Sequence, residues 1–237
     1  MRRALITGAS SGIGEATARA FAPAGFEVAL VARSQSSLDK LADELTALGS
    51  RAKAFVIDLA EVEQVKEQVE AVIAAFGNID VLVNSAGMGY TGLLGDMPLA
   101  DWQRVMNLNV TSVFQVVQAV LPGMRALPTG GVIVNIASIA AQQAFPEWGA
   151  YGVSKAGLVA LSNAISAEEV GYGIRVVTLS PGAVNTPIWD TDTVHADLDR
   201  SAMLNPETVA QTLLHIATLP PEAVIPHLTL TPSKGAL

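Results

Sequence analysis

A tyrosine and a lysine lie four residues apart in Tyr151-Gly152-Val153-Ser154-Lys155. Four residues are about one helical turn, so in a helix both side chains leave the same face. A lysine ammonium stabilises phenolate relative to phenol, and we expect it to lower the pKa of the tyrosine from about 10. A tyrosine activated in this way can exchange a proton with a substrate oxygen. The pair therefore predicts general acid–base chemistry, while an exposed Tyr and Lys on a helix surface remain the alternative.

Two more polar residues could join this chemistry. Ser138 ends the apolar run that begins at Val132, and a hydroxyl there can hold a carbonyl oxygen against Tyr151. A serine at a strand end is also ordinary turn chemistry. Asn109 lies within a long apolar stretch, where a buried amide needs hydrogen-bond partners. One candidate partner is a water chain that leads to Lys155.

A glycine-rich turn follows the first apolar run, over Thr7–Gly14, which reads TGASSGIG. Glycine lets the backbone turn sharply and approach a ligand closely. The helix expected after the turn directs free amide groups and the positive end of its dipole at the turn, where a pyrophosphate can bind. The spacing G-x-x-x-G-x-G differs from the common dinucleotide motif G-x-G-x-x-G. The turn predicts a dinucleotide site, with a tight connection that binds no ligand as the alternative.

The residue after the second expected strand is Arg33, where an acidic residue would favour NAD(H) by bonding the adenosine ribose hydroxyls. An arginine can instead pair with a 2′-phosphate and stack on adenine. Arg33 therefore favours NADP(H) over NAD(H), although a solvated arginine is common at such positions.

Short apolar runs alternate with longer amphipathic ones along the chain, which predicts parallel strands joined by right-handed crossovers. We expect one domain over residues 1–237: an α/β, doubly wound (Rossmann) parallel sheet of about seven strands flanked by helices. The expected strands are Ala4–Ile6, Glu27–Ala32, Ala52–Asp58, Val81–Asn84, Val132–Ser138, Arg175–Ser180 and Leu228–Leu230. The expected helices lie near Ile13–Ala22, Leu38–Leu48, Val62–Phe76, Trp102–Leu127, Gly152–Glu169 and Pro206–Ala217.

Composition restricts the partners and the compartment. The chain is 50% hydrophobic and only 15% charged, which suits strands buried on both faces. Its net charge of −8 argues against nucleic acid or an anionic membrane as the main partner. No apolar run is long enough for a signal peptide or a membrane span, and there are 0 cysteines, so we expect a cytoplasmic protein. The three histidines lack ligand spacing, so no metal is expected.

These motifs together make the chain resemble the short-chain dehydrogenase/reductase family. The resemblance covers nearly the whole chain, in order: Thr7–Gly14, Asp58-Leu59, Asn84-Ser85-Ala86-Gly87, Asn109, Ser138, Tyr151-x-x-x-Lys155, Pro181-Gly182 and Thr186. It implies an oxidoreductase that transfers a hydride between NADP(H), or NAD(H), and a small alcohol or carbonyl substrate. It also implies a homo-dimer or homo-tetramer.

The resemblance also implies roles for single residues. Tyr151 would be the general acid or base, Lys155 would bind the nicotinamide ribose, Ser138 would orient the substrate, and Asn109 would complete a proton relay. The cofactor-binding set would be Gly8, Ser10, Ser11, Gly12, Ile13 and Gly14 in the turn; Arg33, Asp58 and Leu59 at the adenosine end; Asn84, Ala86 and Gly87 near the ribose; and Tyr151, Lys155, Pro181, Gly182 and Thr186 toward the nicotinamide.

Two alternatives and two departures accompany this interpretation. A non-catalytic, cofactor-binding regulator on the same fold would need the glycine turn but not the four polar residues, and a methyltransferase would leave Tyr151 and Lys155 idle. The usual Asn-Asn-Ala-Gly reads Asn84-Ser85-Ala86-Gly87 here, and the usual glycine-rich C-terminal strand is replaced by Pro226–Pro232.

Loop position makes the following residues a candidate substrate wall: Met88, Tyr90, Ala140, Gln142, Trp148 and Trp189. These mostly apolar residues favour an uncharged ketone, aldehyde or secondary alcohol.

Overall fold

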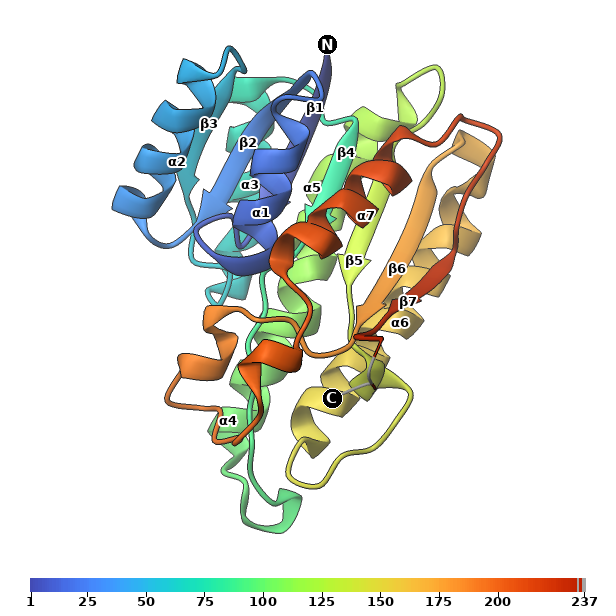
Figure 1. Ribbon diagram of the computed structural model, residues 1–237. Coiled ribbons are helices and arrows are strands. Elements are labelled where there is room, and N and C mark those ends of the chain that lie inside the picture. The colour runs from blue at the N-terminus through green and yellow to red at the C-terminus, as the bar shows by residue number, and fades with distance from the viewer. Residues whose placement is uncertain (234, 236–237) are drawn as a thin grey trace.

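The strands of this protein are apolar runs that pair side by side in one parallel sheet (Figure 1). The computed structural model describes residues 1–233 and 235. The strand order is β3-β2-β1-β4-β5-β6-β7, and every pairing is parallel. The strands are β1 (Arg2–Thr7), β2 (Phe26–Ala32), β3 (Ala52–Val56), β4 (Val81–Asn84), β5 (Val132–Ile136), β6 (Arg175–Pro181) and β7 (His227–Leu230). The predicted doubly wound α/β class with seven strands is confirmed.

Helices cover both faces of the sheet. They are α1 (Gly12–Phe21), α2 (Gln35–Ala47), α3 (Val62–Phe76), α4 (Leu99–Met106), α5 (Ser112–Arg125), α6 (Gly149–Glu169) and α7 (Pro206–Thr218). The single helix expected over Trp102–Leu127 was wrong in detail. It begins earlier, after Pro98, and is divided by the π-helical turn Asn107–Thr111, in which the amide of Ser112 bonds the carbonyl five residues back.

The core lies on the two sides of the sheet because successive side chains of a strand point to opposite faces. On β1, Ala4 and Ile6 pack in the cluster that includes Phe21 of α1, while Leu5 packs in the cluster with Val69 of α3. Helices α1, α2 and α7 cover the first face, and α3, α5 and α6 cover the second. Strands buried on both faces explain why the apolar runs are continuous rather than alternating.

The chain reverses its direction of winding between β1 and β4, which are neighbours in the sheet but far apart in sequence (Figure 1). In open α/β sheets, ligands bind beside the carboxyl ends of the strands at such a switch point. The glycine turn and the segment after β4 both lie there. The topology therefore brings the predicted dinucleotide motif to the edge of the sheet where a cofactor is expected.

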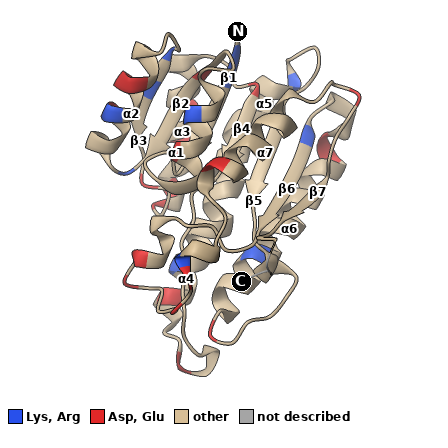
Figure 2. Cartoon of the chain, viewed as in Figure 1, with Lys and Arg blue, Asp and Glu red and all other residues tan. Residues whose placement is uncertain are grey.

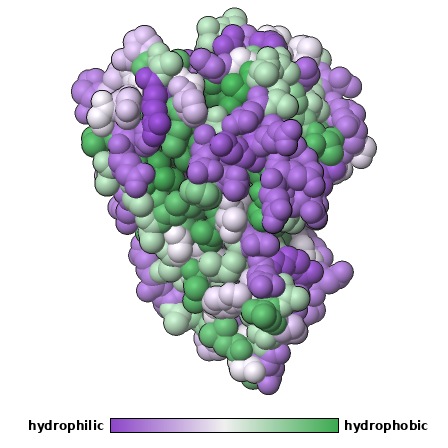
Figure 3. All heavy atoms as spheres, turned by 180° about the vertical axis from the view of Figure 1, so that it is seen from behind, coloured by the Kyte–Doolittle hydropathy of each residue, from purple (hydrophilic) through white to green (hydrophobic). Residues whose placement is uncertain are grey.

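The surface is mixed in charge and polarity. Figure 2 shows acidic and basic residues interspersed over helices and loops, and Figure 3 shows apolar side chains exposed in several places among hydrophilic ones. The stretch Leu99–Arg125 is long and apolar enough to cross a membrane by length and composition alone, and 44% of its apolar 18-residue part is buried in the fold. The expectation of no membrane span stays a prediction.

Candidate active site

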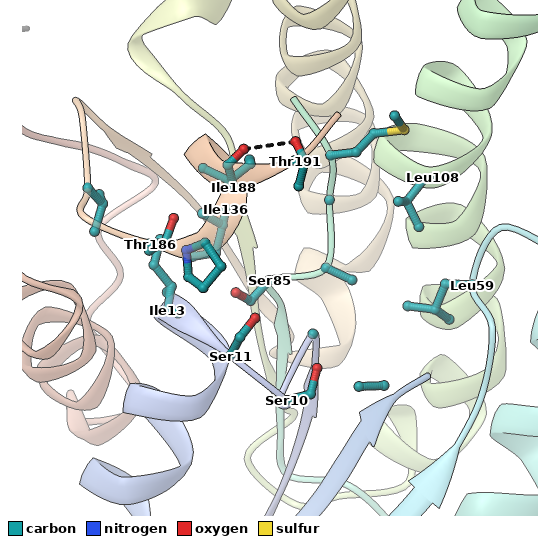
Figure 4. Close-up of a pocket in the computed structure, with 18 of the residues that line it drawn as sticks. Ser10, Ser11, Ile13, Leu59, Ser85, Leu108, Ile136, Thr186, Ile188 and Thr191 are labelled. Carbon is teal, nitrogen blue, oxygen red and sulfur yellow. Dashed lines mark hydrogen bonds between the residues drawn. The ribbon is translucent and has the colours of Figure 1, made fainter. Parts of the chain in front are cut away.

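A cavity of about 720 Å³ opens at the carboxyl ends of the central strands (Figure 4). Most of the predicted site residues line it, although they come from seven separate segments of the chain. The predicted residues found in its wall are Gly8, Ser10, Ser11, Gly12, Ile13, Arg33, Asp58, Leu59, Ala86, Gly87, Ser138, Tyr151, Lys155, Pro181, Gly182 and Thr186. Gly14, Asn84 and Asn109 lie outside this wall, and each has a different contact described below.

The glycine turn is tight, and its glycines are needed where they stand. Gly8 and Gly12 have φ of 68° and 54°, in the left-handed region that side chains disfavour. A Cβ on Gly14 would lie 2.3 Å from the carbonyl oxygen of Gly8, so Gly14 allows α1 to pack closely on the turn rather than facing the cavity. The Thr7 hydroxyl accepts hydrogen bonds of 3.1 Å from the amides of Ser85 and Ala86, which joins the turn to the segment after β4.

The end of the cavity beside β2 and β3 carries its polar residues on short loops. Arg33 is exposed and directly follows β2, where the sequence predicted a reader of the ribose. The next residue, Ser34, caps α2 by accepting from the amide of Ser37 at 3.4 Å. Strand β3 ends at Val56, two residues earlier than expected. Asp58 then forms a turn in which its Oδ1 accepts from the amide of Ala60 at 2.9 Å.

Ser138, Tyr151 and Lys155 line the same part of the cavity. Ser138 lies two residues beyond β5, where its Oγ accepts from the amide of Ala140 at 3.1 Å. Tyr151 and Lys155 lie in the first turns of α6, so the helical spacing predicted for them is confirmed. The Lys155 side chain is only 5% exposed, and its Nζ donates to the carbonyl of Ile136 at 2.8 Å.

Burial dominates the electrostatics of this pair. It raises the pKa of Tyr151 above its ordinary value, while the nearby Ser138 hydroxyl acts in the opposite direction. Burial also lowers the pKa of Lys155 to about 8, because a charged ammonium is costly away from water. Lys155 Nζ is 5.7 Å from the centre of the Tyr151 ring and is bonded to a carbonyl. Burial therefore outweighs any effect of Lys155 on the pKa of Tyr151 here, and the expectation that Lys155 lowers this pKa stays a prediction.

Asn109 is completely buried in the π-helical turn between α4 and α5. Its Oδ1 accepts from the amide of Met88 at 2.9 Å, and its Nδ2 donates to the Met88 carbonyl and to Ser154 Oγ, both at 3.0 Å. The side chain thus joins the segment after β4 to α6. A Cβ on Gly87 would lie 3.1 Å from Asn109 Oδ1 and 3.4 Å from Lys155 Nζ, so both groups lie beside Gly87. The proton relay through Asn109 stays a prediction.

Asn84 points away from the cavity into the sheet. Its Nδ2 donates to Asn135 Oδ1 at 2.8 Å, and Asn135 Nδ2 donates in turn to Ser162 Oγ of α6 at 2.8 Å. The two asparagines are direct neighbours across β4 and β5. Asn84 Nδ2 thus joins two strands and a helix, whereas Asn84 Oδ1 is buried and has no hydrogen-bond partner among the described residues. The ribose contact that the resemblance implies for Asn84 stays a prediction.

Two of the residues expected in the substrate wall line the cavity, and three others do not. Met88 and Trp189 line the cavity. Tyr90 instead borders a smaller cavity of about 270 Å³, because its hydroxyl donates to Asp101 at 3.1 Å. Ala140 lies outside the cavity wall on a 3-10 turn, and Gln142 is exposed.

Trp148 takes part in the wall indirectly. Its ring packs edge-on against Tyr151 and Trp189, with ring centres 5.3 and 5.6 Å apart. Sequence reasoning missed several lining residues that are adjacent to recognised motifs: Ala32, Ser34, Ile57, Ser85, Leu108, Ile136, Ala137, Val184, Pro187, Ile188 and Thr191. Nearness to a motif was the one signal that could have found them, since each lies within two residues of a position that the sequence analysis named.

The cavity suits a dinucleotide on observations of its own wall. The left-handed glycines, the start of α1 and the exposed Arg33 lie in order from the middle of the sheet to β2. Such a turn presents free amide groups to a pyrophosphate. Within the part of the chain that the structure describes, no group of three His, Cys, Asp or Glu side chains is arranged to hold a metal ion.

Residues 2–196 match the family described as short chain dehydrogenase. The chain belongs to the short-chain dehydrogenase family. The 3-oxoacyl-acyl-carrier-protein reductase FabG of Thermotoga maritima is 36% identical over 220 residues, which cover 90% of this chain and 89% of the relative. The family resemblance seen in the sequence motifs is thus confirmed.

Solved structures of a dehydrogenase and a reductase share the whole fold. An alcohol dehydrogenase from Thermococcus sibiricus, complexed with 5-hydroxy-NADP, aligns with a TM-score of 0.90 at 30% identity, covering 99% of this chain and 98% of that one. The L-sorbose reductase of Gluconobacter frateurii, complexed with NADPH and L-sorbose, aligns with a TM-score of 0.86 at 31% identity, covering 97% and 94%. This short-chain dehydrogenase is therefore an oxidoreductase by family, and its relatives act on several kinds of compound.

Proposed function

We propose that this short-chain dehydrogenase transfers a hydride between NADP(H) and the carbon of an uncharged ketone, aldehyde or secondary alcohol, and that Tyr151 moves the accompanying proton. The observation that carries the proposal is that Ser138, Tyr151 and Lys155 line the same cavity as the glycine turn. A protein that only bound a dinucleotide would not need the three polar residues beside that turn.

The preference for NADP(H) over NAD(H) is supported by Arg33. Its exposed guanidinium lines the cavity directly after β2, where it can pair with a 2′-phosphate. The structural relatives from Thermococcus sibiricus and Gluconobacter frateurii carry an NADP derivative and NADPH. We expect Arg33→Ala to weaken NADPH binding about tenfold, the equivalent of one charge-assisted interaction, and to weaken NADH binding less, because NADH lacks the 2′-phosphate. Equal effects on both cofactors would contradict the preference.

Burial sets the resting protonation state of Tyr151. When bound, the nicotinamide supplies or accepts the hydride. Because the pKa of Tyr151 is raised, its phenol stays protonated near neutral pH and can donate its proton to the oxygen of a carbonyl as hydride reaches the carbon. The Ser138 hydroxyl can hold the same oxygen, while Lys155 keeps a positive charge below a pKa of about 8. A carbonyl thus becomes an alcohol, with Tyr151 left as phenolate to be reprotonated.

The substrate end of the cavity is apolar. Met88, Ile188 and Trp189 form its wall, and the charged residues in the described wall are Arg33 and Asp58 at the adenosine end and Lys155 beside the tyrosine. With no further cation there to bind a carboxylate or phosphate, the wall favours an uncharged substrate.

We extend the proposal to the assembly of the protein. Phe114 on α5 and Val153 on α6 are large apolar residues left exposed on helices of the same face. Exposed apolar surface of this kind is often buried between protein subunits. We therefore propose a homo-dimer or homo-tetramer of single-domain subunits.

The experiment that tests the function follows the loss of reduced-nicotinamide absorbance over a panel of ketones, aldehydes and keto esters, with NADPH and with NADH. Tyr151→Phe is the key variant, because it keeps the aromatic ring and removes the hydroxyl group that carries the transferred proton. We expect turnover to fall by about 10²–10⁴-fold while cofactor binding survives. Wild-type protein that binds NADPH yet reduces no carbonyl of the panel would favour a cofactor-binding regulator. Equal turnover by wild type and Tyr151→Phe would refute the role of the tyrosine.

A further inference from the structure

The loop after β6 covers part of the cavity. Its segment Asn185–Asp190, called the strap here, contributes Thr186, Ile188 and Trp189 to the wall. At its start the strap lies against the glycine turn, where a Cβ on Gly12 would be 3.0 Å from the Thr186 side chain. Figure 4 shows Thr186 beside Ile13 of the turn. The strap therefore reaches from β6 across to the start of α1, over the place proposed for the cofactor.

One arginine outside the cavity wall holds this strap. Arg200 Nε donates to Asn185 Oδ1 at 2.8 Å, its Nη2 donates to the Thr186 carbonyl at 3.1 Å, and its Nη1 bonds Asp190 Oδ1 at 3.0 Å. The three nitrogens of one rigid guanidinium thus engage both ends of the strap at once. Such a planar fork loses little freedom for each bond that it forms, which a lysine cannot reproduce.

The other hydrogen bonds of the strap do not replace this contact. Trp189 bonds within the same loop, from its amide to Thr186 and from its indole nitrogen to Val184. The hydroxyl of the next-but-one residue, Thr191, donates to the Ile188 carbonyl at 3.0 Å (Figure 4). The Asn185 amide bonds Leu204 at the edge of the strap. Among the described residues, the Arg200 side chain is thus the one from outside the strap that bonds both the backbone carbonyl of Thr186 and the carboxylate of Asp190.

We propose that Arg200 is a positioning residue that latches the strap over the cofactor groove and slows the release of the bound dinucleotide. The inference rests on the proposed NADP(H) function. Without the guanidinium, Thr186 is free to move away from the glycine turn. Trp189, which packs against Trp148, would move with it. The strap would then open more often, and cofactor would leave faster.

The test compares Arg200→Ala and Arg200→Lys with Arg19→Ala. Arg19 is a matched control because its side chain is 38% exposed, against 37% for Arg200, and it also pairs with carboxylates, but on the outer side of α1. The first measurement is amide hydrogen exchange over the strap in protein without cofactor. The second is the dissociation rate of NADPH, followed by its fluorescence.

Both Arg200 variants are expected to exchange faster in the strap and to release NADPH about tenfold faster, the size of one lost charge-assisted hydrogen bond. Guanidinium ion added to Arg200→Ala is expected to restore part of the slow release. Strap exchange and NADPH release that match wild type or Arg19→Ala in both variants would overturn the latch. Wild-type protein that binds no NADPH would overturn the proposed function itself, while faster strap exchange in Arg200→Ala without cofactor would still support the structural contact.

Discussion

Replacing Lys155 with methionine is expected to stabilise the fold and to remove activity. Lys155 is 5% exposed, and burial lowers its pKa from 10.5 to about 8. Methionine fills similar volume without a charge. The same burial that suits the lysine to the site thus makes it costly to the folded state at neutral pH.

The size of the effect follows from the pKa shift. A change of about 2.5 pKa units corresponds to about 3 kcal/mol, since each unit is about 1.4 kcal/mol. The variant also loses the hydrogen bond from Lys155 Nζ to the Ile136 carbonyl, which is worth about 1 kcal/mol net. We therefore expect Lys155→Met to raise the free energy of unfolding by about 2 kcal/mol at pH 7.

The increase in the free energy of unfolding of Lys155→Met is expected to depend on pH in a defined direction. Between pH 8 and 10.5 the unfolded lysine binds a proton that the folded lysine has lost. Wild-type stability therefore rises with pH across this window relative to the variant. The difference in free energy of unfolding between the variant and wild type is largest below pH 8, decreases as the pH rises, and falls close to zero by about pH 10.

Urea unfolding of cofactor-free protein at pH 7, 8, 9 and 10, followed by tryptophan fluorescence at one protein concentration, measures the difference. Lys40→Met, which replaces an exposed lysine of α2, controls for the general loss of a positive charge. A difference between wild type and Lys155→Met that is the same at all four pH values would refute the reasoning. Reductase activity of the variant is expected to fall at least about 10²-fold.

Three further changes give distinct results. Gly14→Ala places a Cβ 2.3 Å from the Gly8 carbonyl oxygen, so it should distort the glycine turn and raise the KM for NADPH at least about tenfold, whereas an unchanged KM would contradict the close packing. Glu169→Gln removes a buried carboxylate that bonds Arg125, so it should lower the melting temperature by about 3 °C with kcat unchanged, and an unaltered melting temperature would show that the pair contributes nothing. Trp189→Ala should raise the KM for ketones with bulky apolar groups more than for small ones, and an unaltered substrate profile would remove Trp189 from the wall.

Much of this site could be predicted from local sequence. Continuous apolar runs indicated strands buried on both faces, and TGASSGIG indicated the turn, because strand and turn preferences act over a few residues. Tyr151 and Lys155 share a helical face because their spacing is one turn. The alternation of strands and helices indicated parallel strands, because right-handed crossovers between parallel strands are nearly invariant.

Other features needed the folded chain. The orientation of Asn84 toward Asn135, and the use of Asn109 to bond Met88, arise between segments far apart in sequence. The local sequence Tyr151–Lys155 does not indicate that Lys155 is buried and bonded to the Ile136 carbonyl.

The sequence by itself therefore determined the family, the sheet and the candidate reactive groups. The tertiary structure alone decided their pKa values, the contents of the substrate wall and the hold of Arg200 on the strap. The physical reason is the distance along the chain over which each effect acts. Backbone preferences and helical spacing are properties of neighbouring residues, whereas burial and hydrogen-bond partners depend on which distant segments the fold brings together.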